Sequence, residues 1–395
     1  MMRTAQLTMR HLTMRNCHPK IIRQRIVYSS WACRINVLIV VILTLMIWSK
    51  VSDTWQRAFA EDSALDYIEK IKCTDCFPLE LQQSPQRRRG EVSEKKEGGP
   101  NRSKKCQFGK DEGGLVIMIF SQAQDTFRRF LIRETWGNSS NVRIYFVLGR
   151  QGAPSESKKH GDIIVSGLWD SRSNLTLKAI FALNWAVQNC PDAKYVMRSA
   201  DDILINIRNL FQIIDTNDLT YKIVGHCRDV SIVNRDKTSP QFVSYQSYPL
   251  KYYSKSCSPN AGYLMTLQTA LDIVQISQQI PYFHLEDAYI SFCAVKLKVE
   301  RVNLYPFNSS RYYPWSRAPE VRFDELDLLY YCSCVATIPG LLLDEQHQLW
   351  FGSRKVKNCK LLSNFECNLM KKGIWRILNT KNAIFGPGER DKVLR

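Results

Sequence analysis

Short apolar runs alternate with amphipathic stretches through the middle of the chain. The runs GGLVIMIF (113–120), VRIYFVLG (142–149) and KYVMRSADD (194–202) predict buried β-strands, because each is short and ends in glycine or polar residues. The stretches 127–137 and 174–190 between them carry apolar residues at helical spacing. Strands that alternate with helices predict an α/β fold, with a mostly parallel sheet flanked by helices.

The same alternation continues towards the C-terminus. A helix is expected at 207–215 and a strand at 222–227. Beyond about residue 320 the pattern weakens and predicts no definite element, and we find no internal repeat.

The N-terminal part contains the longest apolar run, INVLIVVILTLMIW at 35–48. With its neighbours it reaches about 18 residues, the short end of a membrane span. Basic residues crowd its N-terminal side, whereas the first acid is Asp53. Positive charge favours the cytosolic side, so we expect a cytosolic tail at 1–30, a signal-anchor helix at 31–50 and a lumenal remainder.

Two other interpretations of this run fit its flanks less well. A buried core helix does not explain the one-sided charge. A cleaved signal peptide needs small residues at a cleavage site, and WSKVSDTW after the run offers a poor one.

Residues 51–112 are expected to form a lumenal stem. Its stretch SPQRRRGEVSEKKEGGPNRSKK (84–105) is charged and nearly devoid of apolar residues. Such a stretch cannot bury enough surface to fold, so it predicts an extended tether. The folded domain is expected to occupy 113–395.

The net charge of +18 is unevenly distributed. Residues 1–52 hold eight basic and no acidic residues, and 53–112 hold 12 of each sign, which leaves +10 for the folded domain. We find neither a basic stripe with aromatic platforms nor a known nucleic-acid module, so no nucleic-acid partner is predicted.

The cysteines fit an oxidising compartment. Of 13 cysteines, 11 follow the membrane run, and this odd number leaves a free thiol or a disulfide-linked homodimer open. Cys73 and Cys76 form a C-x-x-C; in a lumenal stem a disulfide is a better interpretation than redox chemistry or a zinc site. Four sequons would be open to N-glycosylation there, at Asn101, Asn138, Asn174 and Asn308.

Two acidic pairs are candidates for chemistry. Asp201 and Asp202 follow a predicted strand, and ligands of such sheets bind outside the carboxyl ends of the strands. They would hold Mg²⁺ or Mn²⁺, or only cap the next helix. Glu286 and Asp287 open a predicted helix, where acids are favoured by the helix dipole or act as a general base.

Several motifs occur in a characteristic order around these pairs. They are IRETWG (132–137), FVLG (146–149), HGDII (160–164), DSRSNLTLKAI (170–180), RSADD (198–202), CSPNAGYLMT (257–266) and EDAYISFC (286–293). Together they resemble the β-1,3-galactosyltransferase and β-1,3-N-acetylglucosaminyltransferase family over residues 115–305. The resemblance implies a GT-A fold with a Rossmann-like sheet, in a type II membrane protein of the Golgi.

The same resemblance implies the reaction. A UDP-sugar would be the donor, Mn²⁺ or Mg²⁺ the cofactor, and a glycan on protein or lipid the acceptor of an inverting transfer. Asp202 would touch the metal and Asp287 would be the catalytic base. The expected donor-binding residues are Arg133, Trp136, Asp170, Asn174, Lys178, Arg198 and Asp201. The expected acceptor-side residues are Glu286, Gly262 and Tyr263.

The chain departs from the family pattern in the metal motif. Arg198 stands where the family has lysine, and Ala200 where it has the first of three acids. A catalytically weak paralogue that binds UDP-sugar or glycan is therefore the alternative, and a stem-dimerised scaffold is a third. Because Asp202 and Asp287 are both present, we favour an active enzyme.

Overall fold

The computed structural model describes residues 26–70, 106–108, 114–239, 242–308, 323, 325–356 and 359–371. The chain divides into two units, residues 1–58 and residues 59–395, and each is described by itself. The expected cytosolic tail, the segment 84–105, Cys73, Cys76 and Asn101 lie outside the described residues.

Helix α2 (Ile26–Lys70) contains the apolar run of the first unit. Its segment Val37–Ile68 is long and apolar enough to cross a membrane by length and composition. The large apolar side chains from Val37 to Trp48 are exposed in the described structure, as a membrane-facing surface requires. The helix does not end at residue 50 but continues into the expected stem.

The last turns of α2 belong to the second unit. Ala60, Ala64 and Ile68 recur every four residues on one helix face and are buried. Tyr67 packs against Phe292, with ring centroids 6.1 Å apart. Arg301 donates a hydrogen bond to Glu61 in an ion pair beside this contact. Residues 59–68 of the expected stem are therefore part of the folded domain rather than a free tether.

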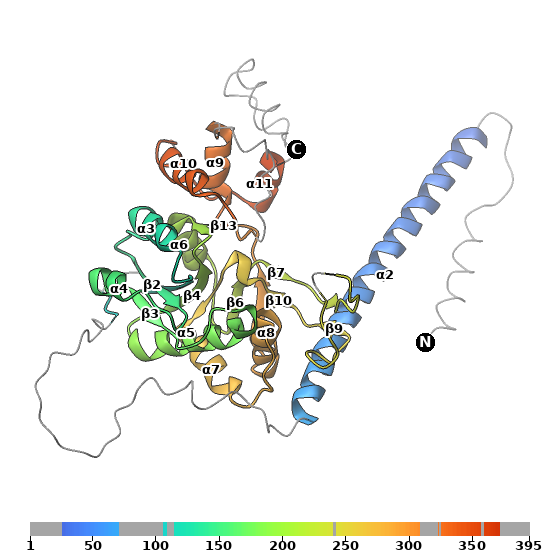
Figure 1. The fold of residues 1–395 in the computed structure, drawn as a ribbon. Helices are drawn as coiled ribbons and strands as arrows, with labels where there is room; N and C mark the ends of the chain where they lie inside the picture. Colours follow the sequence, from blue (N-terminus) through green and yellow to red (C-terminus); the bar gives the residue numbers. More distant parts are fainter. Residues whose placement is uncertain are drawn as a thin grey trace, which may run out of the picture. The chain divides into compact units, whose positions relative to one another are not determined.

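A seven-stranded sheet forms the centre of the second unit (Figure 1), with the order β12-β6-β11-β4-β1-β2-β3. Its strands are β1 (Leu115–Phe120), β2 (Val142–Leu148), β3 (Ile163–Val165), β4 (Tyr195–Ala200), β6 (Lys222–Gly225), β11 (Tyr263–Thr266) and β12 (Glu300–Asn303). Only β11 runs antiparallel to its neighbours. The mostly parallel sheet confirms the predicted fold class.

Helices cover both faces of this sheet. One face carries α5 (Leu175–Asn189), α7 (Leu267–Ser277) and α8 (Glu286–Lys296); the other carries α3 (Thr126–Glu134), α6 (Ile207–Thr216) and α9 (Glu325–Cys334). Side chains of β1 alternate between the two cores: Val116 and Met118 join the first, and Ile117 and Ile119 the second. This is why the strand reads as an unbroken apolar run.

Shorter elements connect these layers. They are α4 (Pro154–His160), η2 (Arg172–Asn174), β5 (Ile203–Ile205), β7 (Cys227–Arg228), β8 (Ser231–Ile232), β9 (Tyr252–Tyr253), β10 (Ser256–Cys257), η3 (Pro259–Ala261), β13 (Thr337–Pro339), α10 (Leu343–Ser353) and α11 (Asn364–Lys371). Strand β13 pairs with β5, β10 with β7, and β9 with β8.

Within the described residues, four disulfides link parts of the chain. They join Cys106–Cys190, Cys227–Cys257, Cys332–Cys359 and Cys334–Cys367. The last two hold α9, α10 and α11 together, in the region where the sequence pattern predicts nothing definite. Among the described cysteines with placed side chains, Cys293 is free and buried. An intermolecular disulfide through these residues is not shown.

The docked end of α2 can be tested with Ala64→Glu. The substitution places a carboxylate at a position that is fully buried. We expect a loss on the order of 2–4 kcal/mol in the free energy of unfolding. Thermal unfolding of the detergent-purified full chain measures it. Ala58→Glu, at an exposed alanine of the same helix, is the matched control. Equal melting temperatures for the two variants would contradict the docking.

Candidate active site

The candidate site begins where β1 and β4 end side by side. Phe120, the last residue of β1, pairs in register with Ala200, the last residue of β4. The Asp201 backbone N–H donates to the Phe120 carbonyl at 3.0 Å. Asp201 and Asp202 therefore lie at the carboxyl edge of the parallel sheet, where such folds bind ligands.

The two aspartates differ in environment. Asp201 is 9% exposed, and its Oδ2 is buried with no hydrogen-bond partner in the described part of the chain. Burial raises the pKa of Asp201 to about 6, opposed by the nearby Ser121 hydroxyl. Asp202 is less buried, and its carbonyl accepts the Gly340 N–H at 3.0 Å. The side chain of Asp202 binds no other described residue and remains available to a ligand.

Arg128 is a candidate that sequence reasoning missed. Its Nη1 is buried and has no hydrogen-bond partner among the described residues. Its charge opposes the rise that burial causes in the pKa of Asp201. The stretch FRRFLIRE carries three arginines, and only Arg133 belongs to a family motif, so the sequence alone does not distinguish Arg128. A guanidinium with one buried, unpaired nitrogen beside the strand ends is suited to an anionic ligand.

Arg129, the neighbouring arginine, holds the loop after β1. It is fully buried and donates to the Ser121 hydroxyl at 2.8 Å and to the backbone carbonyls of Gln122 and Ala123. It also pairs with Glu156 at 2.7 Å. These contacts fix the loop that borders Asp201 without leaving Arg129 free for a substrate.

Lys178 and Asp170 tie the ends of β1 and β2 to helix α5. Lys178 Nζ donates to Asp170 Oδ1 at 2.6 Å and to the Ser121 carbonyl at 3.1 Å. The Gly149 N–H, just after β2, donates to the other Asp170 oxygen at 3.0 Å. A side chain on Gly149 would collide with this carboxylate. Burial lowers the pKa of Lys178, and Asp170 opposes the shift.

Other expected donor residues are also held by the protein. The Asn174 amide donates to the Trp169 carbonyl at 2.9 Å. Arg133 forms ion pairs with Glu156 and Asp162, both at 2.7 Å. These contacts give Asn174 and Arg133 structural roles, and their contact with a nucleotide stays a prediction.

Trp136 is fully buried near the C-terminal end of α3. Helix α3 leads from the end of β1 back towards the start of β2, so Trp136 lies towards the sheet edge opposite to Asp201 and Asp202. Its contact with a donor nucleotide is a prediction that no described contact supports.

A buried ion pair joins the two acidic motifs. Arg198 on β4 donates to Glu286 Oε2 on α8 at 2.7 Å, and both side chains are at most 6% exposed. Its other branch donates to the Pro259 carbonyl at 2.9 Å. The Tyr263 hydroxyl donates to Glu286 Oε1 at 3.0 Å. Glu286 is therefore fully engaged and is a positioning group rather than a free acid.

Gly262 makes this arrangement sterically feasible. Its φ is +71°, in the region that favours glycine, and a Cβ there would approach the Arg198 carbonyl to 3.1 Å and the Met197 methyl to 2.7 Å. Gly262 thus brings Tyr263 beside β4, on the acceptor side of the expected site.

Asp287 is the carboxylate that this network leaves free. Its Oδ1 accepts the Ala288 backbone N–H at 2.9 Å, and it forms no ion pair within the described residues. Burial raises the pKa of Asp287, while the charge of Arg228 opposes the shift. Burial, and to a smaller extent the charge of Asp287, raise the pKa of Tyr253 to about 12. A buried carboxylate with a raised pKa and no ion-pair partner among the described residues suits a general base.

The carboxylates of the site determine how a metal ion could bind there. The described residues contain no group of three or more His, Cys, Asp or Glu side chains that would enclose an ion. Mg²⁺ and Mn²⁺ instead often use one or two carboxylates together with substrate phosphates. Asp202, beside the unpartnered oxygen of Asp201, fits that mode of binding.

The remaining sequons differ in their surroundings. Asn138 is exposed, whereas the Asn308 amide donates to the Thr337 carbonyl at 3.1 Å. Thr176, the third residue of the Asn174 sequon, is fully buried. Asn138 is therefore the most accessible of the described sequons.

Comparison with known proteins agrees with these motifs. The Galactosyltransferase family model matches residues 127–305. Beta-1,3-galactosyltransferase 1 of Mus musculus is 30% identical over 280 residues, which cover 66% of this chain and 79% of the relative. The chain belongs to the β-1,3-galactosyltransferase family. The matched region contains both acidic motifs and the Arg198–Glu286 ion pair that joins them.

Other members and one solved structure complete the comparison. Beta-1,3-galactosyltransferase 5 of Mus musculus is 30% identical over 204 residues, covering 48% of this chain and 66% of the relative. The chain thus spans slightly less than two thirds of that relative. A crystal structure of a glycosyltransferase involved in the glycosylation of the major capsid of PBCV-1 matches 59% of the chain and 98% of its own, with 11% identity and a TM-score of 0.31.

The burial of Asp201 predicts a dependence of stability on pH. Its folded-state pKa of about 6 lies above the ordinary 3.8, so the folded chain holds this proton more tightly than the unfolded chain. Stability therefore falls as pH rises between these values and stays lower above them. We expect Asp201→Asn to stabilise the protein at pH 7.5 in chelator, on the order of 1–3 kcal/mol.

Thermal unfolding at several pH values measures this effect. The gain should shrink as pH falls through about 6 and vanish near pH 4. Asp202→Asn, at the less buried neighbour, is the control and should show a smaller gain. A gain that is equal at pH 4 and pH 7.5 would contradict the role of the buried charge.

Proposed function

We propose that this protein is an inverting hexosyltransferase of the Golgi. It moves galactose or an N-acetylhexosamine from a UDP-sugar to an acceptor glycan on protein or lipid, in β-1,3 linkage. The supporting observation is the 2.7 Å contact between Arg198 and Glu286, which brings the two acidic motifs into one site. Membership of a family whose relatives are named beta-1,3-galactosyltransferases supports the donor class and the linkage.

The donor half of the proposed site lies at the ends of β1 and β4. Asp202 would hold Mn²⁺ or Mg²⁺, which supplies charge for the leaving diphosphate when it is bound. Arg128, with its buried unpartnered Nη1, would bind a phosphate oxygen directly. Lys178 and Arg129 fix the Ser121 loop beside Asp201. The UDP-sugar would therefore bind against a loop that is already in place.

The acceptor half begins at α8. Asp287 would accept the proton of the acceptor hydroxyl while the hydroxyl oxygen attacks the anomeric carbon from the face opposite to UDP. Glu286 cannot share this role because Arg198 and Tyr263 occupy its two oxygens. The raised pKa of Asp287 brings it nearer to the working pH of a base.

The proposed topology follows from α2. The apolar helix would anchor the protein in the Golgi membrane with its basic N-terminus in the cytosol and its transferase domain in the lumen. The intrachain disulfides of the second unit support an oxidising compartment.

A catalytically weak paralogue is the second candidate, and Ala200 is the observation that favours it. Alanine at this position removes an acid that the family places beside the metal. Loss of a supporting ligand typically costs about 10- to 100-fold in affinity, whereas loss of a general base costs about 10²–10⁴-fold in rate. With Asp202 and Asp287 present, the loss at Ala200 leaves an active enzyme.

Variants of the two motifs separate binding from chemistry. Asp287→Asn keeps the shape of the side chain and removes the base, so transfer should fall by about 10²-fold or more while UDP-sugar binding changes only by a few-fold. Calorimetric binding and the rate of product formation from UDP-galactose, UDP-N-acetylglucosamine and UDP-N-acetylgalactosamine measure the two effects. Unchanged transfer would show that the base lies elsewhere.

Substitutions in the metal motif complete the test. Asp202→Ala should abolish metal-dependent transfer, and Ala200→Asp should tighten Mn²⁺ by no more than about 10- to 100-fold. If Asp201→Ala were instead the lethal change and Asp202→Ala were mild, Asp201 would be the metal ligand.

A further inference from the structure

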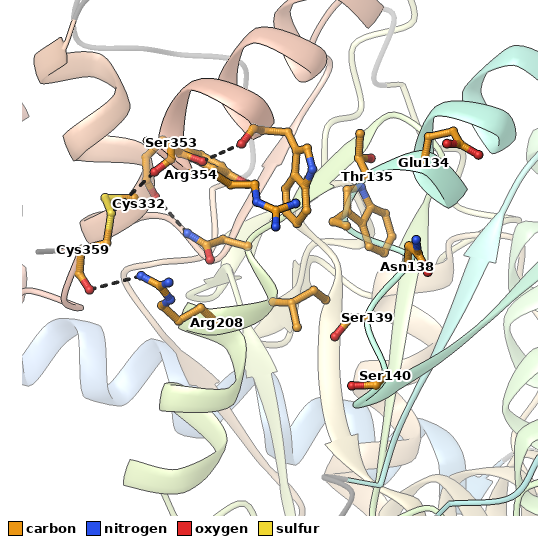
Figure 2. Close-up of a pocket in the computed structure, with 15 residues that line it drawn as sticks. Glu134, Thr135, Asn138, Ser139, Ser140, Arg208, Cys332, Ser353, Arg354 and Cys359 are labelled. Carbon is orange, nitrogen blue, oxygen red and sulfur yellow. Dashed lines mark hydrogen bonds between the residues drawn. A yellow bond between two sulfur atoms is a disulfide. The ribbon is translucent and has the colours of Figure 1, made fainter. Parts of the chain in front are cut away.

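A cavity lies on the α3 and α6 side of the sheet, and its lining includes neither of the two acidic pairs. It has a volume of about 460 Å³, within the usual range of small-molecule pockets. Its wall combines the C-terminal end of α3, the start of α6 and residues of α9 and α10. Figure 2 shows Asn138, Ser139 and Ser140 on one side and Arg208, Ser353 and Arg354 on the other.

Hydrogen-bond donors without partners gather at this cavity. Trp136 Nε1, the Tyr331 hydroxyl and Trp350 Nε1 are buried, belong to lining residues and have no partner among the described residues. Buried polar groups in native proteins are nearly always paired, so three unpaired donors at one cavity indicate that a partner binds there. The occupant that satisfies it carries several hydrogen-bond acceptors.

The arginines that line the cavity also favour an occupant with hydrogen-bond acceptors. Arg208 and Arg354 are both exposed at the cavity, and the Arg354 guanidinium lies 5.8 Å from the Trp350 ring centroid. Arg208 reaches the Cys359 carbonyl only at 3.4 Å. A guanidinium near an indole ring can bind a molecule that has both polar groups and apolar faces, such as a sugar.

The chain carries an attachment point for such a sugar in the cavity wall itself. Asn138, Ser139 and Ser140 form a sequon, and all three residues line the cavity. Asn138 is exposed, so its amide nitrogen is accessible for attachment. A glycan attached here begins at the cavity and needs no free ligand to fill it.

We propose that the N-glycan on Asn138 occupies this cavity with its innermost N-acetylglucosamine residues. The Asn138 amide nitrogen loses a proton and bonds to the anomeric carbon of a lipid-diphosphate-linked oligosaccharide, and the lipid diphosphate leaves. The acetamido carbonyl and ring hydroxyls then accept from the arginines, after small shifts that also bring the buried indole and phenol donors into reach. The glycan thereby fastens α9 and α10 to the end of α3.

Protection from a glycosidase tests the proposal. The full chain is produced in glycosylating eukaryotic cells, and each sequon is followed by mass spectrometry during treatment with an amidase that removes N-glycans. The Asn138 glycan should be released about tenfold more slowly from the native protein than from the unfolded chain, equivalent to about 1.4 kcal/mol of protection. Equal release rates, or absence of a glycan at Asn138, would overturn the proposal.

Matched variants identify the cavity as the cause of protection. Arg208→Ala with Arg354→Ala, both at exposed positions, should restore rapid native release. Ser140→Ala removes the sequon and should lower the melting temperature, whereas Ser140→Thr keeps the sequon and should not. If protection persists in the double arginine variant and Ser140→Ala melts like Ser140→Thr, the glycan lies outside the cavity. Because no transfer assay is used, these outcomes are independent of the proposed reaction.

Discussion

The buried contact between Arg198 and Glu286 is the constraint on which the site depends. Taking both charges out of water is costly, and the pair is tolerated because each partner is also hydrogen-bonded, Arg198 to Pro259 and Glu286 to Tyr263. Removing one partner would leave an uncompensated buried charge, at a cost of about 3–5 kcal/mol. The end of β4 and the start of α8 are therefore held together, and Asp202 and Asp287 follow from their positions on these two elements.

The shape of the guanidinium suits Arg198 to these two contacts. The planar guanidinium reaches Pro259 with one nitrogen and Glu286 with another, in a fixed geometry. A second network of hydrogen bonds lies at the end of β1, where Arg129 and Lys178 hold the Ser121 loop in place. Asp201, Asp202, Arg128 and Asp287, by contrast, form no ion pair among the described residues, which agrees with the substrate-binding roles proposed for them.

The sequence predicted the parts of the fold that local pattern controls. The unbroken apolar run of β1 and the helical spacing of α5 predicted an α/β fold. Because Asp201 and Asp202 follow a predicted strand, the sequence also placed them at the carboxyl edge of the sheet. The pairing of Arg198 with Glu286 could not be predicted, because the residues are 88 positions apart and neither looks unusual alone. The docking of Ala64 and the C-terminal helices depends on long-range packing and disulfides in the same way.

The clearest test of the account is the release of UDP by the purified protein. With an acceptor glycan and one of the three UDP-sugars, release should be rapid with Mn²⁺, stop when the metal is chelated, and return when Mn²⁺ is added again. Binding of a UDP-sugar without any release, under conditions in which the protein remains folded, would contradict transfer and favour the weak paralogue.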